Sequence, residues 1–188
     1  LGGTFEDQQD TFTDLGILMV LIIILVFIVM AAQFESLVDP FVIMFSIPFA
    51  FTGIVLGLAV TQTPLGVMAL IGVIMLMGIV VKNGIVLIDY TILCRERGMG
   101  IITSVVTAGK SRLRPVLMTT LTTVLGMIPM AVGTGEGSEM WRSMGMTVAW
   151  GLSVSTLITL IIVPTVYAVF AANGVKRRRR KIRKALRN

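Results

Sequence analysis

The chain reads PFVIMFSIPFAFTGIVLGLAVTQTPLGVMALIGVIMLMGIVV from Pro40 to Val81, a run of 42 residues without one formal charge. A helix needs about 20 apolar residues to cross a bilayer, so this run is long enough for two crossings. The whole chain has the same character, because 55% of its 188 residues are hydrophobic and 14% are charged. Soluble proteins carry roughly 25% charged residues. The sequence therefore predicts a membrane protein.

Working outward from this run, polar residues and prolines divide the chain into five hydrophobic segments. The expected spans are residues 15–32, 40–60, 65–93, 115–132 and 144–172. Backbone groups in lipid must be paired, and the alternating segments of roughly ten residues that build a barrel are missing, so the spans are predicted to be helices. The fold class is an all-α bundle of five transmembrane helices. Between residues 95 and 114 the pattern favours a short amphipathic connector helix on the cytoplasmic face.

The charged residues indicate how the chain is oriented. Residues 1–14 hold four acidic and no basic residues, whereas nine of the sixteen Lys and Arg lie in the tail, residues 173–188. Basic residues mark cytoplasmic segments, so the tail is expected to be cytoplasmic and residues 1–14 periplasmic. A basic run directly after a span is typical of a membrane anchor. Nucleic-acid binding is therefore not expected.

Residue usage also limits the chemistry. The chain has no His and a single Cys, Cys94, so neither a zinc site nor a serine or cysteine triad can be assembled. The thirteen methionines are interpreted as adaptable packing, in preference to a path for soft metals. We expect no enzymatic activity, no bound metal and no cofactor.

Lys82 is the most informative residue, because it places an ammonium near the middle of an apolar helix. Such a charge costs about 2.5 kcal/mol or more at the bilayer centre, so it normally faces the protein interior beside an anionic partner. Asp89 is seven residues further on, about 10 Å along the helix, which is too far for a direct pair. We therefore expect Lys82 to be buried against a carboxylate from outside this chain. A Lys82 side chain exposed to acyl chains or water would contradict that expectation.

A second candidate group opens the fourth span. Arg112 and Thr119 are seven residues apart on one helical face, where Thr119 could line a polar path. Thr120, Thr122 and Thr123 are expected to bond back to preceding carbonyls. Arg114 is interpreted as a positive-inside anchor.

The sequence resembles the resistance-nodulation-division (RND) transporters, in particular the hydrophobe and amphiphile efflux branch of the acridine-resistance pump type. The resemblance covers nearly the whole chain. It is carried by AAQFES at 31–36, KNGIVLID at 82–89, RLRPVLMTT at 112–120 and GTGEGS at 133–138.

The resemblance implies that the chain is the C-terminal membrane part of such a transporter, its eighth to twelfth helices, with residues 1–14 ending a periplasmic porter region. Lys82, Arg112 and Thr119 then fall on the family's proton relay, with Asn83 and Asp89 as accessory polar positions. The paired relay aspartates belong to the first half of the transporter. The implied protein is a homotrimeric proton antiporter of the bacterial inner membrane, working with a periplasmic adaptor and an outer-membrane channel.

The expected function is proton-driven export of drugs or other hydrophobic and amphiphilic compounds. Two alternatives stay open. The same membrane core could serve another cargo, such as a lipid, a metal ion or a translocated protein. The chain by itself could also be an inactive structural fragment, because the carboxylates that Lys82 needs are expected elsewhere.

Overall fold

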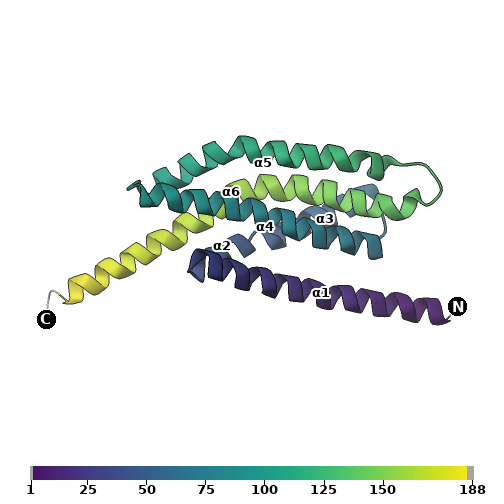
Figure 1. The fold of residues 1–188 in the computed structure, drawn as a ribbon, viewed down its shortest axis with the longest axis horizontal. Helices are drawn as coiled ribbons and strands as arrows, with labels where there is room; N and C mark the ends of the chain where they lie inside the picture. Colours follow the sequence, from purple (N-terminus) through teal and green to yellow (C-terminus); the bar gives the residue numbers. More distant parts are fainter. Residues whose placement is uncertain (1, 186–188) are drawn as a thin grey trace.

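The computed structural model describes the backbone of residues 2–185 and the side chains of residues 3–176. The expected basic tail lies mostly outside the described side chains. Within the described residues the fold is entirely helical (Figure 1). The helices are α1 (Gly2–Phe34), α2 (Val38–Met44), α3 (Ile47–Thr61), α4 (Val67–Glu96), α5 (Ile101–Val132) and α6 (Ser138–Ala185).

Five segments of the described chain are long and apolar enough to cross a membrane. They are Gly3–Phe34, Val38–Thr61, Val67–Glu96, Ile101–Val132 and Ser138–Lys176. The predicted fold class, an all-α bundle with five transmembrane helices, is confirmed. The helices reach beyond the expected spans, because α1 already includes residues 2–14 and α6 continues past residue 172.

The second span is one crossing built from two helices. It is interrupted at Phe45 and Ser46, between α2 and α3. Pro48, in the first turn of α3, has no N–H to donate to the Met44 carbonyl, and its ring clashes with a carbonyl four residues earlier. The Ser46 hydroxyl donates to the Ile43 carbonyl at 2.6 Å, so a side-chain hydrogen bond forms where the helix is interrupted. The second span therefore breaks just before this proline.

The expected connector helix is not a separate element. Residues 101–114 are helical, but they continue through Pro115 into α5 without interruption. Ser104 and Ala108 are fully buried, and Ala108 packs with Val163 and Tyr167. This packing aligns the first turns of α5 with the bundle, so they do not lie flat on the membrane. Thirty-two residues make α5 about 48 Å long, longer than the roughly 30 Å hydrocarbon core.

α6 is the central helix, with α3, α4 and α5 packed around it, while α1 lies at the edge and contacts α2 and α4 (Figure 1). Glycines bring α3 close to α6. A Cβ at Gly53 would lie 2.8 Å from the Val154 Cβ, and one at Gly57 would overlap Trp150. Gly53 and Gly57 form a GxxxG pair, which permits this close approach of two membrane helices.

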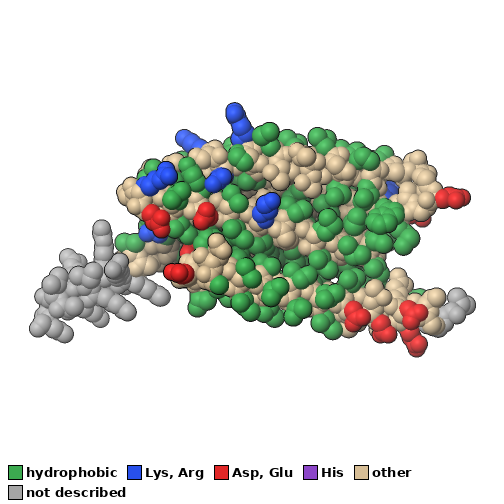
Figure 2. Space-filling model, in the orientation of Figure 1, with side chains coloured by type: hydrophobic (Ala, Val, Ile, Leu, Met, Phe, Trp, Pro, Cys, Tyr) green, Lys and Arg blue, Asp and Glu red, His purple; other side chains and the backbone are tan. Residues whose placement is uncertain are grey.

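The charged side chains are unevenly distributed along the bundle, although acidic side chains also lie among the basic ones at the end opposite the start of α1 (Figure 2). Acidic side chains cluster at the N-terminal end of α1, and basic side chains gather toward the opposite end, with an apolar surface between them (Figure 2). The first helical turn of α1 and the C-terminal end of α6 also lie at opposite ends of the bundle (Figure 1). An odd number of membrane crossings requires the start of α1 and the end of α6 to lie at opposite ends of the bundle, as they do here.

Candidate functional site

Lys82 lies halfway along α4 on its exposed stripe. The other exposed members of that stripe are Met75, Gly78, Asp89 and Leu93. The side chain borders a 310 Å³ groove between α1 and α4. Lys82 is therefore exposed in this chain, which differs from the expectation of a buried ammonium. The physical reason is that α1 covers only one edge of the stripe.

The groove beside Lys82 is apolar and open. Leu25 and Val29 line it from α1, and Val81 and Val86 line it from α4. A Cβ placed on Gly78 would meet no heavy atom within 4 Å, unlike those at the packed glycines of α3. The groove thus combines a cation, apolar walls and a small residue that permits close approach of another helix.

The described residues provide no carboxylate that pairs with Lys82. Asp89 is exposed on the same stripe, but seven residues along a helix correspond to about 10 Å. Asp89 lies seven residues before Glu96, the last residue of α4. The Lys82 ammonium, halfway along α4, therefore has no paired carboxylate among the described residues.

The structure gives Arg112 and Arg114 different surroundings. Arg114 is exposed, whereas Arg112 is half-buried. The Arg112 guanidinium carbon lies 4.8 Å from the centroid of the Tyr90 ring, within cation–π range. Its Nε is buried without a hydrogen-bond partner. Arg112 is therefore held against α4, and Tyr90 is a site residue that sequence reasoning missed.

This contact also fixes the level of Thr119. α4 and α5 run antiparallel. Moving seven residues toward the N-terminus of α4 from Tyr90 therefore goes in the same direction as moving seven residues toward the C-terminus of α5 from Arg112. Each step covers about 10 Å. They arrive at Asn83 and Thr119. Lys82, Asn83 and Thr119 therefore share one level of the bundle, although they were placed in two separate groups from the sequence.

The back-bonding expected of the α5 hydroxyls is confirmed for Thr122 and Thr123 and is wrong for Thr120. Thr119 is exposed and donates to the Pro115 carbonyl at 3.0 Å, as Thr122 and Thr123 do to their own preceding carbonyls. Thr120 does not. It is buried and hydrogen-bonds across to Thr156 of α6 at 3.0 Å.

α6 adds buried hydroxyls at this level that sequence reasoning also missed. Ser155 is fully buried and Thr159 is 3% exposed, and neither hydroxyl has a hydrogen-bond partner. A signal was present, since Val148, Leu152, Ser155, Thr159 and Val163 follow the spacing of one buried helix face. Asn83, 8% exposed, completes a polar layer at mid-depth on α4, α5 and α6.

A helical bundle that holds ionisable and hydroxyl side chains at mid-depth has the architecture of a membrane transport protein. Comparison with known proteins agrees. The AcrB/AcrD/AcrF family matches residues 1–171 of the chain. The chain therefore belongs to this family of RND transporters.

Relatives named for different functions match the same region. The swarming motility protein SwrC of Bacillus subtilis is 42% identical over 90% of the chain, and the cobalt-zinc-cadmium resistance protein CzcA of Cupriavidus metallidurans is 38% identical over 88%. The multidrug resistance protein MdtC of Proteus mirabilis is 35% identical over 94%. The chain spans 16 to 17% of these relatives' lengths.

A solved structure shares the fold. The crystal structure of a heavy metal efflux pump superposes with a TM-score of 0.81 at 30% identity, over 89% of this chain and 16% of that chain. The helical bundle therefore has the fold of one membrane region of that much longer pump.

Proposed function

We propose that this chain forms the second half of the membrane core of a proton-driven efflux transporter and supplies the Lys, Arg and Thr side of its proton relay. The observation that carries the proposal is the position of Lys82, an ammonium at mid-depth beside an open apolar groove. Arg112 and Thr119 are the other relay residues, and Asn83 and Asp89 are accessory polar positions.

The groove is the place where the first half of the transporter packs. A helix that enters beside Gly78 can bring carboxylates to Lys82, and the opposite charge offsets the desolvation of the ammonium. Protonation of a carboxylate removes that attraction, so Lys82 reorients and α4 shifts against its neighbour. One proton moving inward releases about 2.3 kcal/mol per 100 mV, enough to change a two-state equilibrium roughly fifty-fold.

The same proposal sets the location and the partners. The transporter lies in the bacterial inner membrane as a homotrimer, with residues 1–14 periplasmic and the basic tail cytoplasmic. A periplasmic adaptor and an outer-membrane channel complete the export path. The proton gradient drives transport without a bound cofactor.

The proposed cargo is a hydrophobic or amphiphilic compound, supported by the efflux-branch motifs and by the relative named for multidrug resistance. Export of divalent metal ions is the second candidate. It is supported by the relative named for cobalt, zinc and cadmium resistance and by the heavy metal pump of the same fold. Resistance profiles of cells with the complete transporter, measured with amphiphilic drugs and with zinc or cobalt salts, separate the two.

The relay assignment is tested in the complete transporter. Lys82→Ala and Thr119→Ala are expected to abolish resistance at normal expression, because each removes a group needed for coupling. Lys110→Ala is the matched control, since Lys110 is an exposed basic residue of α5 outside the relay. Full resistance in Lys82→Ala would refute the assignment. Proton flux through the 188-residue chain alone in proteoliposomes would refute the view that the missing half is required.

A further inference from the structure

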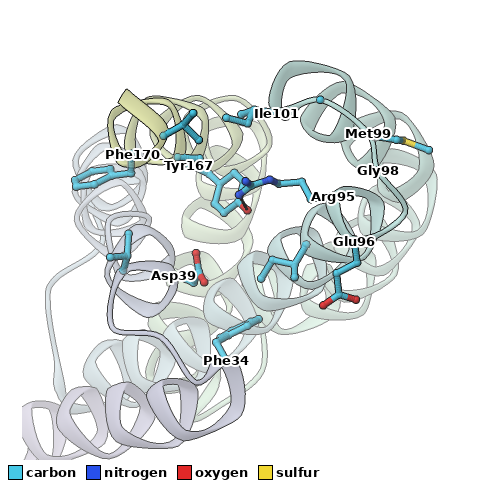
Figure 3. A pocket seen from close by; sticks show the side chains of 14 residues that line it. Phe34, Asp39, Arg95, Glu96, Gly98, Met99, Ile101, Tyr167 and Phe170 are labelled. Atoms are coloured by element: carbon cyan, nitrogen blue, oxygen red, sulfur yellow. Dashed lines mark hydrogen bonds between the residues drawn. The ribbon is translucent and has the colours of Figure 1, made fainter. Parts of the chain in front are cut away.

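A second cavity lies at the end of the bundle where α4 stops. It measures 620 Å³, is open on one side, and is lined by the turn between α1 and α2, the last turn of α4 with the loop that follows it, the start of α5, and α6 (Figure 3). Arg95 is thirteen residues beyond Lys82, about 20 Å along the helix. The cavity is therefore separate from the relay site.

Opposite charges face this cavity without neutralising each other directly. Arg95 Nη1 donates to the Tyr167 hydroxyl at 3.1 Å, and the Tyr167 side chain is 4% exposed, so the guanidinium is held by a fixed partner. Asp39 lies across the cavity from it (Figure 3). No ion pair joins these two described residues. Glu96 contributes a second, exposed carboxylate to the lining.

The remaining walls are apolar. Phe34 and Phe170 border the cavity on either side of Asp39 (Figure 3), and Ile92 and Val175 extend the apolar lining. α1 ends at Phe34 and α4 ends at Glu96, so the cavity is level with the ends of two spans. A site at this depth meets the boundary between acyl chains and head groups.

We propose that this cavity binds the head group of a zwitterionic aminophospholipid. The phosphate accepts charge-assisted hydrogen bonds from Arg95, and the ammonium, one ethylene unit away, faces Asp39 and Glu96. The acyl chains leave along Phe34 and Phe170. The volume falls within the range of ligand pockets, about 300 to 1,000 Å³.

The charge pattern selects among phospholipids. A purely anionic head group would satisfy Arg95 but would lie against two carboxylates, and like charges in contact disfavour binding. An aminophospholipid satisfies both signs. The site depends on neither the relay nor the cargo proposed above, so either proposal can fail while the other stands.

The test uses the complete transporter, delipidated in detergent and titrated with dioleoylphosphatidylethanolamine while native mass spectrometry counts bound lipid. We expect one tight site per protomer. Arg95→Gln should weaken it at least about tenfold, the effect of losing a charge-assisted hydrogen bond. Asp39→Asn should weaken phosphatidylethanolamine binding and strengthen phosphatidylglycerol binding, because it removes a carboxylate that attracts the ammonium and repels an anionic head group. Arg95→Lys, which keeps the charge, should retain most of the binding. Arg97→Gln is the matched control, because Arg97 is an exposed arginine two residues away that does not line the cavity.

Several outcomes would overturn the proposal. Equal affinity of wild type and Arg95→Gln would show that the lipid binds elsewhere. Equal retention of phosphatidylglycerol and phosphatidylethanolamine by the wild type would remove the role of Asp39. Displacement of the lipid by millimolar inorganic phosphate or free phosphoethanolamine would identify a soluble ligand as the occupant. Each variant is first checked for an unchanged trimer by size-exclusion chromatography. If Arg95→Gln fails this check, the comparison of Asp39→Asn with the wild type decides, and equal lipid selectivity of the two would overturn the proposal.

Discussion

The Arg112 guanidinium is packed on the ring of Tyr90, with 4.8 Å between the guanidinium carbon and the ring centroid. The contact joins α5 to α4 about 10 Å from the level of Lys82 and Thr119. Since the Arg112 Nε is buried without a hydrogen-bond partner, the ring is a principal local stabiliser of that cation. A displacement of α4 therefore changes the surroundings of Arg112 directly.

Tyr90 is expected to act as a positioning residue for Arg112. Tyr90→Leu removes the ring and should lower proton-coupled transport by the complete transporter roughly 2- to 30-fold, the range of a cation–π contact of about 0.5 to 2 kcal/mol. Tyr90→Phe keeps the ring and should keep transport. The measurement is substrate efflux as a function of external pH. Loss of a positioned cation shifts the pH profile, whereas a general loss of folded protein lowers the efflux rate by the same factor at every pH. Equal activity of the Leu and Phe variants would contradict the role.

The sequence was sufficient for the number of spans, because charge and hydropathy alone determine which segments enter lipid. It was not sufficient for Lys82, which was expected to be buried and is exposed. It was not sufficient for side-chain partners. Thr119 and Thr120 are adjacent hydroxyls with the same local pattern, and only the position of α6 makes one exposed and the other buried against Thr156. Pro48 and Pro115 show the same limit. Both remove a backbone donor, yet the helix breaks at the first and continues through the second.

The hydrogen bond between Thr120 and Thr156 predicts a measurable contribution to stability. Thr120→Val should lower the free energy of unfolding in detergent micelles by about 0.6 to 1.7 kcal/mol, the range for interhelical hydrogen bonds in membranes. Thr122→Val, at an exposed position whose hydroxyl bonds its own helix, should change it by less. A double-mutant cycle with Thr156→Val isolates the pair, and a coupling energy of zero would show that the bond contributes nothing.

Close packing between α5 and α6 predicts that Gly145 cannot be replaced. A Cβ there would lie 2.9 Å from the Ala131 backbone nitrogen, and a backbone atom cannot rotate away. Gly145→Ala should therefore cost about 1 to 3 kcal/mol of unfolding free energy. At Gly126 of α5 the added methyl meets nothing within 4 Å, so Gly126→Ala should be neutral or stabilising by up to about 1 kcal/mol. The same loss of stability in both variants would show that the helix contact is looser than described.

Lys82 should show opposite effects on membrane insertion and on function. The ammonium lies at mid-depth of α4 beside apolar side chains, so Lys82→Met should make insertion of α4 more favourable by about 2.5 to 3.5 kcal/mol. The same substitution should abolish transport by the complete protein, because the carboxylates of the first half lose their counter-charge. Insertion is measured by glycosylation mapping of α4 in a host protein. The matched control combines Lys82→Met with Met75→Lys, which moves the charge two turns along the exposed stripe. If Lys82→Met left the insertion free energy unchanged, the ammonium would already be hydrated in the membrane, and the cost on which its functional role rests would not exist.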